Sequence, residues 1–346
     1  SLLTFSQNFD KRIEKMTNAT EKQVIDWRHW FHENAELSNR EFKTADRIAS
    51  ILTEIGYEPK TGIAKTGVVA VLEGGKPGPV VGLRADIDGL PVKERADIPW
   101  ASKQMGEYNG EQVPVMHACG HDTHLSILLG VAKMLWEMKD QVPGTVKFIF
   151  QPAEEGAPEG EEGGAELMVK EQVLKNPDVD VIFGLHIDSR VPVGILQVRP
   201  EGILAASNSF RIDIKGKQTH GSEPWYGTDP IVTAAQIINN LQTVVSRNAQ
   251  LTKAPAVVSI GAIHSGVRNN IIPEDLYMLG TIRTLDPEMI EMVLIRVREV
   301  ATRTAESINA EMTIKIDKGN PVTFYEPSLF NQMLHTLKRM AGEGNV

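Results

Sequence analysis

The stretch PVVGLRADID, residues 79–88, passes from an apolar run directly into two aspartates. Its apolar part is short and continuous rather than alternating, which is typical of a strand buried on both faces of a sheet. Three further runs share this character: GVVAVLEG (67–74), GTVKFIFQP (144–152) and VDVIFGLHI (179–187). A helical segment, THLSILLGVAKMLWEMKD (123–140), separates the run at 79–88 from the run at 144–152. This alternation predicts an α/β domain with a mixed, largely parallel sheet flanked by helices.

Two more helices are predicted ahead of these strands. Thr20 and Gln23 have the spacing of a capping box, and Ser38 and Glu41 repeat it, so a helix is expected to begin at each place. Apolar residues recur with helical period in the second segment, and Gly56 is its expected stop.

A second unit is predicted from about residue 203 to 318. Its segments read strand, helix, strand, strand, helix, strand, which is the order of a ferredoxin-like split unit. Asp229 and Pro230 open its first helix. We therefore expect an inserted α+β lid or dimerisation domain. Its amphipathic helix and edge strands suit pairing, so we also expect a homodimer through the lid.

The same boundaries define the catalytic domain, which is expected to comprise residues 1–202 and 319–346. Gly202 and Gly319 lie near the two junctions and are candidate hinges for a movement that closes the inserted domain on substrate.

Composition narrows the classes of partner. The 346 residues carry a formal net charge of -9, which argues against nucleic acid or an anionic membrane as the main partner. No apolar stretch approaches the roughly 20 residues that a membrane-spanning helix needs. Cys119 is the sole cysteine, so an intramolecular disulfide is excluded. The polar start SLLTFSQNFDKRIEKM is expected to be either a mature end left by signal-peptide removal or an expression scar.

Side chains that bind metals follow the predicted strands. They are Asp86 and Asp88, Glu154 and Glu155, and His186, joined by His117, Cys119, His121, Asp122 and His124 of MHACGHDTH (116–124). Ligands in open α/β sheets bind beyond the carboxyl ends of strands, so four segments should supply one edge. Alone, a cysteine is more often a small buried hydrophobe, and paired glutamates are more often a solvated loop. Together, thiolate, imidazole and carboxylate predict a zinc, manganese or cobalt site.

The adjacent pair Glu154–Glu155 suggests a mechanism. One of the two can bind metal while its neighbour faces a metal-activated water. Two cations about 3.5–4 Å apart would lower the pKa of that water and polarise a scissile carbonyl. The glutamate that is not a ligand would move the proton to the leaving amine. Asp86 could orient an imidazole.

Several motifs then carry a family resemblance. LRADIDGLPV, MHACGHDTH, QPAEEG, GLHI, GKQTHGSEP, RNNIIP and GTIRT occur in this order from about residue 83 to 284. Together they resemble the dinuclear metallopeptidase and amidohydrolase family of aminoacylases, hippurate hydrolases, carboxypeptidases and plant auxin-conjugate hydrolases. The resemblance is strongest to the hippurate and auxin-conjugate branch, which has a cysteine among its ligands, and it runs from about residue 24 to the last residue.

The resemblance implies two divalent ions, which could be zinc, manganese, cobalt or nickel. It implies that Glu154 is the general base and acid, and that Asp86 belongs to the first motif. Arg84 stands where other branches have a histidine ligand, so the ligand set should be the cysteine-containing one. That set is Cys119, as a bridge between the ions, with His121, Glu155 and His186.

The inserted domain is implied to contribute substrate-binding residues. His220 matches a residue that polarises the substrate carbonyl. Asn270 and Arg283 match residues that hold the substrate carboxylate, and Arg283 could bind that carboxylate in a bidentate manner. Each of these residues also has a simpler interpretation: a turn cap at His220, a turn former at Asn270 and a solvated surface charge at Arg283. His117 and His124 are expected to be structural or to support ligands.

The resemblance also sets an expectation for the end of the chain. Members usually continue for some tens of residues past Gly344–Asn345, with another acidic motif and a last histidine ligand. We expect that this part of the catalytic domain is cut off, supplied otherwise, or lost from a weakened site. His335 does not match that ligand.

The function that these residues predict is metal-dependent hydrolysis of the amide bond of an N-acyl amino acid or a short peptide-like substrate. A cysteine hydrolase that pairs Cys119 with His121 or His186 is the first alternative. A non-catalytic metal- or ligand-binding homologue is the second.

Overall fold

The computed structural model describes residues 2–346, with side chains from residue 9 onward. It divides into two compact units, one extending to Arg190 and one from Val191 to Val346. This division groups residues 319–346 with the second unit, whereas the sequence assigns them to the catalytic domain, and that assignment stays a prediction. Within residues 2–346, no helix combines the length and the apolar character needed to cross a membrane.

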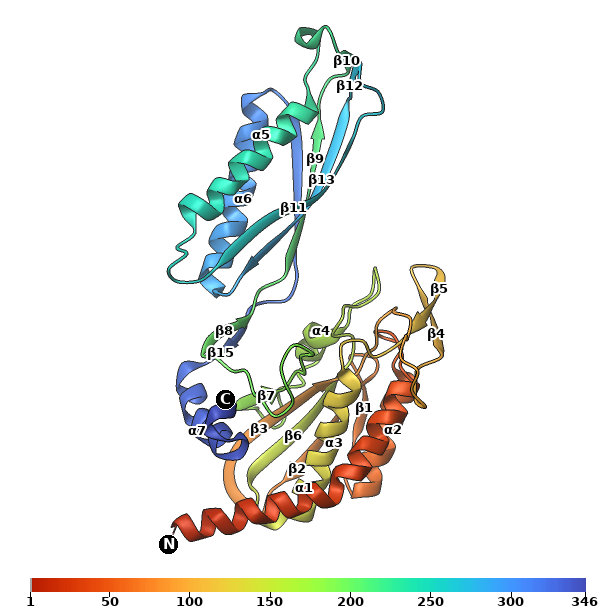
Figure 1. Cartoon of the computed structure of the whole chain (residues 1–346), viewed down its shortest axis with the longest axis vertical. Coiled ribbons are helices and arrows are strands. Elements are labelled where there is room, and N and C mark those ends of the chain that lie inside the picture. The colour runs from red at the N-terminus through yellow and green to blue at the C-terminus, as the bar shows by residue number, and fades with distance from the viewer. Residues whose placement is uncertain (1) are drawn as a thin grey trace. The chain divides into compact units, whose positions relative to one another are not determined.

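The first unit is built on a five-stranded sheet with the order β1-β2-β6-β3-β7 (Figure 1). Its strands are β1 (Lys60–Ile63), β2 (Gly67–Glu73), β3 (Lys76–Asp86), β6 (Pro143–Gln151) and β7 (Val181–Gly184). β3 is parallel to both β6 and β7, whereas β2 is antiparallel to β1 and β6. The predicted mixed α/β fold is confirmed, with its parallel part centred on β3.

Helices cover both faces of this sheet. Alternate residues of β2 divide between them: Val68, Ala70 and Leu72 join the larger core, and Val69 joins the smaller one. The larger core is formed with α1 (Leu2–Glu33), α2 (Phe42–Ile55) and α3 (His121–Glu137). On the other face Met168 of α4 (Gly164–Lys170) packs against Val69 and Ile149. This double burial explains the continuous apolar runs.

The predicted start of the first helix at Thr20 is wrong. α1 begins at Leu2, and Thr20 is a buried residue inside it. Phe9 and Met16 pack against the larger core, so apolar burial extends the helix through the expected cap.

The predicted capping box at Ser38 is also wrong, because tertiary partners take its side chains. The Ser38 hydroxyl donates to Asp88 Oδ2 at 2.7 Å, and α2 begins only after Glu41 without a side-chain cap. The predicted stop at Gly56 is confirmed: it has φ 123°, and its N–H donates to two carbonyls of the last turn.

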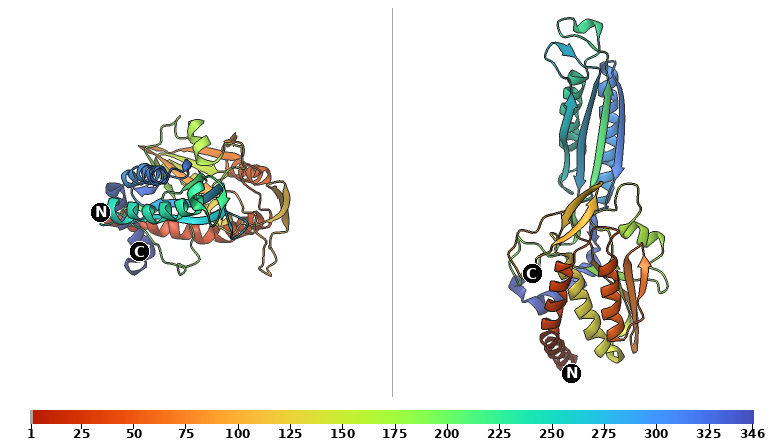
Figure 2. Two further views of the ribbon diagram at one scale, coloured as in Figure 1. Left: turned by 90° about the horizontal axis from the view of Figure 1, so that it is seen from above. Right: turned by 90° about the vertical axis from the view of Figure 1, so that its right-hand side faces the viewer.

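The second unit has the predicted order of elements. They are β9 (Asn208–Lys215), α5 (Pro230–Thr243), β11 (Ala256–Ser265), β13 (Asp275–Thr284), α6 (Pro287–Ser307) and β14 (Glu311–Lys318). The strands form an antiparallel sheet, β11-β13-β9-β14. α5 and α6 lie together on one face of it (Figure 2). Asp229 caps α5 by accepting from two main-chain N–H groups, as predicted.

Shorter elements complete the chain. They are β4 (Gln104–Tyr108) paired with β5 (Glu111–Val115), β8 (Glu201–Leu204) with β15 (Thr323–Tyr325), β10 (Thr219–His220) with β12 (Ile271–Ile272), α7 (Pro327–Ala341), and the single turns η1 (Lys139–Gln141), η2 (Pro224–Tyr226), η3 (Val244–Asn248) and η4 (Glu343–Asn345).

The two predicted hinge glycines have a packing reason. A Cβ at Gly202 would lie 2.0 Å from the Leu285 carbonyl oxygen, and one at Gly319 would lie 2.2 Å from that of Ser207. The backbone therefore approaches too closely for any side chain at either position. Their role as hinges stays a prediction.

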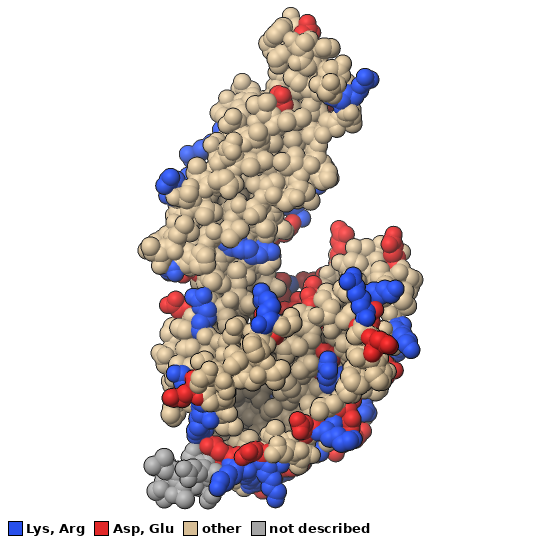
Figure 3. Space-filling model, viewed as in Figure 1, with Lys and Arg blue, Asp and Glu red and all other residues tan. Residues whose placement is uncertain are grey.

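Charge is spread over the first unit. On the face shown in Figure 3, Lys and Arg side chains are interspersed with Asp and Glu over this unit. Despite the net charge of -9, this unit therefore has no single continuous acidic patch among the described residues on that face.

Candidate metal centre

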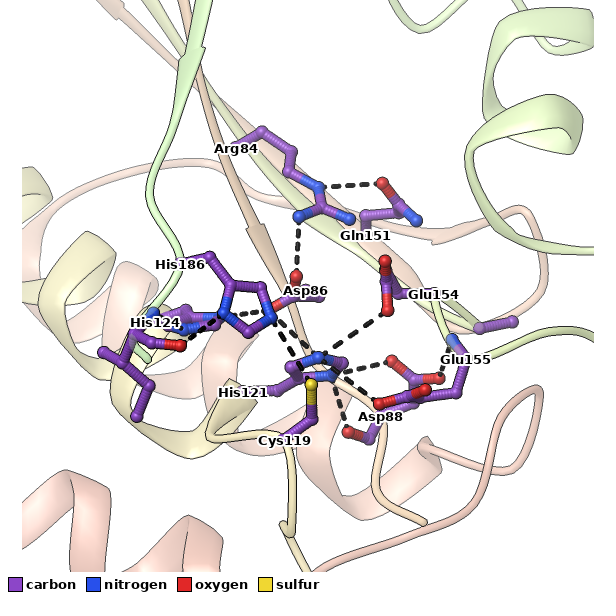
Figure 4. A network of polar contacts seen from close by, with 12 residues as sticks. Arg84, Asp86, Asp88, Cys119, His121, His124, Gln151, Glu154, Glu155 and His186 are labelled. Carbon is purple, nitrogen blue, oxygen red and sulfur yellow. Dashed lines mark hydrogen bonds and ion pairs between the residues drawn. The ribbon is translucent and has the colours of Figure 1, made fainter. Parts of the chain in front are cut away.

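The candidate metal centre lies at the carboxyl edge of the parallel strands in the first unit (Figure 4). The strand ends supply its side chains: Asp86 at the end of β3, Glu154 and Glu155 after β6, and His186 after β7. α3 begins at His121 beside them. The structure therefore brings these residues to one edge, where open α/β sheets bind ligands.

The ligand atoms of Cys119, His121 and His186 lie within 4.8 Å of one another. Cys119 Sγ is 3.3 Å from His186 Nε2. Between the first two residues Gly120 has φ 88°, and a Cβ on it would lie 2.3 Å from the Ile187 side chain. The turn that presents the thiol and the imidazole together therefore requires glycine.

Hydrogen bonds fix the tautomers of His121 and His186. His121 Nδ1 donates to the Asp88 carbonyl oxygen at 2.9 Å and to Asp88 Oδ1 at 3.1 Å. His186 Nδ1 donates to the carbonyl oxygen of Ile187 at 2.6 Å. In the neutral form of each ring the lone pair therefore lies on Nε2. His121 Nε2 is buried and has no hydrogen-bond partner among the described residues, as expected of a nitrogen that binds a cation.

His124 has the opposite arrangement. Its Nε2 accepts from the Ile187 N–H at 2.9 Å, so its Nδ1 carries the proton and donates to Asp86 Oδ1 at 2.6 Å. Both ring nitrogens are thus occupied, in agreement with a supporting role. Asp86 also accepts from Arg84 Nη1 at 2.6 Å. The imidazole that Asp86 orients is therefore that of His124, whereas Asp88 orients His121.

Three carboxylates face the unpartnered nitrogen of His121. Asp86 Oδ1, Glu154 Oε2 and Glu155 Oε1 lie 3.8, 3.7 and 3.8 Å from His121 Nε2. These separations exceed hydrogen-bond range, and the atoms of His121, Glu154 and Glu155 lie within 4.8 Å of one another. One thiol, two available imidazole nitrogens and several carboxylates form a donor set that fits zinc or a similar divalent ion.

Electrostatics in the site favour a cation. Burial, followed by the charges of Glu155 and Glu154, raises the pKa of the Cys119 thiol to about 12. Burial by itself would lower the pKa of His121, but its hydrogen bond to Asp88 and the charge of Asp86 raise it to about 9. Burial also raises the pKa of Glu154. A divalent ion would offset the crowded negative charge and displace the protons of the thiol and the imidazole.

The predicted substrate-binding residues lie in the second unit. His220 and Asn270 are neighbours, because the Gly221 N–H donates to the Asn270 carbonyl oxygen at 2.9 Å. Since the Ser222 N–H donates to His220 Nδ1 at 3.1 Å, a neutral His220 carries its proton on Nε2. This is the turn-capping bond that the simpler reading anticipates, and it leaves Nε2 as a donor.

Arg283 is not near this pair. It lies at the far end of β13, where its Nη1 donates to the carbonyl oxygens of Asn208 and Ile282 at 3.0 and 3.1 Å. At about 3.3 Å per residue along β13, His220 and Arg283 are roughly 25 Å apart or more.

Two carboxylates support the site in roles that the sequence did not assign to them. Asp88 orients His121 and accepts from the Glu155 N–H at 3.0 Å. Glu41, assigned to a helix cap by its spacing, accepts from the Ala153 N–H at 2.8 Å. The position of Asp88 two residues after Asp86 is a signal that it shares the strand end, but nothing in the sequence connects Glu41 with the site.

Comparison with known proteins agrees with this geometry. Residues 82–346 match the model of peptidase family M20/M25/M40. The chain is 38% identical over 335 residues to thermostable carboxypeptidase 2 of Saccharolobus solfataricus, covering 95% of this chain and 81% of that one. It is 35% identical over 317 residues to an N-acyl-L-amino acid amidohydrolase of Geobacillus stearothermophilus, covering 91% and 82%.

A solved structure is also similar. The Bacillus subtilis YXEP protein, described as a dinuclear metal-binding peptidase of the M20 family, superposes with a TM-score of 0.77 at 34% identity, over 93% of this chain and 81% of that one. The match of the family model covers most of the chain and includes every residue of the candidate centre. The protein is therefore a metal-dependent amidohydrolase or peptidase, and it belongs to peptidase family M20/M25/M40.

Proposed function

We propose that this enzyme hydrolyses the amide bond of N-acyl amino acids or short peptide-like substrates. Its metal ligands are Cys119, His121, Glu155 and His186, and Glu154 is its general base and acid. The names of its relatives, a carboxypeptidase and an N-acyl-L-amino acid amidohydrolase, support this substrate class.

The observation that carries the proposal is that the carboxylates of Glu154 and Glu155 both face His121 Nε2. This nitrogen is buried and unpartnered among the described residues, and it faces both Glu154 and Glu155 at 3.7–3.8 Å. Adjacent glutamates thus reach one point with separate carboxylates, so one can bind metal while the other transfers protons.

The chemistry of the chain's own residues follows from this division. When bound, the divalent ions supply Lewis acidity that polarises the scissile carbonyl and makes water more acidic. Glu154 takes a proton from the attacking water as the water oxygen bonds to the carbonyl carbon. It then gives that proton to the amine nitrogen as the C–N bond breaks. A raised pKa suits a carboxylate that must both accept and return a proton.

Residues of the second unit bind the substrate in this proposal. The Nε2–H of His220 donates to the substrate carbonyl oxygen, and Asn270 and Arg283 hold the carboxylate. No small N-acyl amino acid spans the roughly 25 Å along β13 that separates His220 from Arg283. We therefore propose a homodimer in which one copy supplies His220 and its neighbour Asn270, and the other supplies Arg283, to each substrate. The exposed edge strands β11 and β14 suit such pairing.

Substitution of the proposed base tests the mechanism. Glu154→Gln removes the proton acceptor and should lower kcat by about 100-fold or more, with bound metal unchanged by elemental analysis. Glu159→Gln, an exposed glutamate of the same acidic loop, is the matched control and should keep the wild-type rate. An unchanged kcat in Glu154→Gln would remove this residue from the mechanism.

A cysteine hydrolase is favoured by one observation, the 3.3 Å contact of Cys119 Sγ with His186 Nε2. The pKa of about 12 for the thiol opposes it, because a protonated thiol is a poor nucleophile. It also leaves Glu154 and Glu155 without a role. Exhaustive chelation separates the two functions: the metal route loses activity on chelation and regains it when metal is added back, whereas a thiol nucleophile needs no metal.

A further inference from the structure

We propose that Glu41 is a positioning residue that fixes the turn carrying Glu154 and Glu155. This inference rests on the proposed function of those two glutamates. Glu41, more than 100 positions before Glu154 in the sequence, would thereby have a role in catalysis.

Both oxygens of the Glu41 carboxylate are used. Oε1 accepts from the Ala153 N–H at 2.8 Å, and Oε2 accepts from the Thr66 hydroxyl at 2.6 Å. Glu41 is 0% exposed. Burying a carboxylate is costly unless its hydrogen bonds are made. The first bond ties the segment before α2 to the turn after β6, and the second ties it to the connection between β1 and β2.

The turn itself needs such support. Ala153 has φ +48°, in the left-handed region that a residue with a Cβ adopts at a cost of about 1 kcal/mol or more. Its carbonyl oxygen lies against Gly164, where an added Cβ would be 2.7 Å away. Ala153 therefore redirects the chain sharply, one residue before Glu154.

A second carboxylate holds the other side of Glu154. Asp88 Oδ2 accepts from the Glu155 N–H at 3.0 Å and from the Ser38 hydroxyl at 2.7 Å. The main chain is thus fixed by one buried carboxylate at residue 153 and by another at residue 155. Glu154 lies between the two anchors, so the direction of its side chain is set by the backbone.

A purely structural role is the competing explanation, and the chain offers a matched control for it. Glu36 also accepts one main-chain N–H and one threonine hydroxyl, both from Thr44, at 2.9 and 3.0 Å. Those bonds lie at the start of α2, and neither involves a residue of the 153–155 turn. Glu36→Ala therefore removes the same number and kinds of bonds as Glu41→Ala without loosening the turn.

The experiment compares Glu41→Ala, Glu41→Gln and Glu36→Ala in the full chain. Each is measured for kcat and KM on an N-acyl amino acid, for Mn²⁺ affinity by isothermal titration, and for melting temperature. We expect Glu41→Ala to lower kcat by 10- to 100-fold with KM within about threefold, and to weaken Mn²⁺ binding by about tenfold or more. Glu36→Ala should lower only the melting temperature, and Glu41→Gln, which keeps an acceptor for Ala153, should restore kcat and affinity.

The proposal is overturned if Glu41→Ala and Glu36→Ala melt earlier by similar amounts while kcat and Mn²⁺ affinity stay at wild-type values in both. It is also overturned if Glu41→Gln is as impaired as Glu41→Ala. Should Glu41→Ala fail to fold, the comparison of Glu41→Gln with Glu41→Asp, whose shorter side chain withdraws the acceptor, decides the point. If the wild type hydrolyses no substrate, the proposed function fails, and the Mn²⁺ titrations still decide whether Glu41 holds the turn.

Discussion

At the scale of single residues, His121 and His124 lie one turn apart on α3 and use opposite ring nitrogens. His121 donates through Nδ1 to Asp88 and keeps the Nε2 lone pair, whereas His124 accepts at Nε2 from Ile187. A cation can therefore bind Nε2 of the first ring and not that of the second. The choice depends on which acceptor or donor the surrounding loops present to each ring.

Glu41 is also expected to make the stability of the fold depend on pH. Burial, together with the charge of Asp88, raises its pKa to about 7 from an ordinary 4.5. A carboxyl with a raised pKa holds its proton more tightly in the folded state than in the unfolded state. The free energy of unfolding should therefore fall as the pH rises from about 4.5 to 7, by up to roughly 3 kcal/mol from this group.

Urea unfolding of the wild type and of Glu41→Gln between pH 5 and 8 measures this contribution. The amide does not titrate, so the variant should gain stability relative to the wild type as the pH rises. A difference between the two proteins that stays constant across this range would contradict the raised pKa.

The residue types of the site were predictable, and their pairing was not. Strand ends and the segment 116–124 identify the side chains that gather at the site, because parallel strands share a carboxyl edge. The sequence did not reveal that Asp88 orients His121 while Asp86 orients His124. That pairing depends on how the start of α3 lies against the end of β3, which is settled only by tertiary packing.

At the scale of elements, Lys147 of β6 organises the connection between α4 and β7. Its buried ammonium group donates to the carbonyl oxygens of Val173, Lys175 and Pro177 at 3.0, 2.8 and 3.0 Å. Burial lowers the pKa of this lysine. The three bonds compensate for the buried charge and satisfy carbonyl groups that form no regular secondary structure.

Lys147→Met should therefore destabilise the first unit by about 2–4 kcal/mol in urea unfolding, because three carbonyl groups lose their donor. Lys60→Met on exposed β1 is the control and should change stability by less than about 0.5 kcal/mol. Equal effects of the two substitutions would show that the carbonyl contacts contribute little.

Most elements were predictable because their signals are local. The continuous apolar runs, the cap at Asp229 and the stop at Gly56 each depend on a few neighbouring residues. The starts of the first two helices were predicted wrongly for two reasons. Core packing by Phe9 and Met16 extends α1, and contacts to distant segments take the side chains of Ser38 and Glu41.

At the scale of the whole molecule, the proposed dimer predicts that each active site needs residues from both copies. His220→Ala and Arg283→Ala should each be nearly inactive as pure proteins. When the two are mixed and allowed to exchange, half of the dimers become heterodimers. Each heterodimer has one site with both residues intact, so activity should return to about a quarter of the wild-type value. A mixture no more active than its components would contradict sharing of the site between copies.

The central claim, metal-dependent amide hydrolysis at the centre of the first unit, is tested most directly by one assay. The protein is incubated with a panel of N-acetyl and N-benzoyl amino acids, with added manganese or zinc, before and after exhaustive chelation. We predict release of the free amino acid from at least one substrate, its loss on chelation and its return when metal is added back. Release that survives exhaustive chelation, or none from folded, metal-loaded protein, would contradict the account.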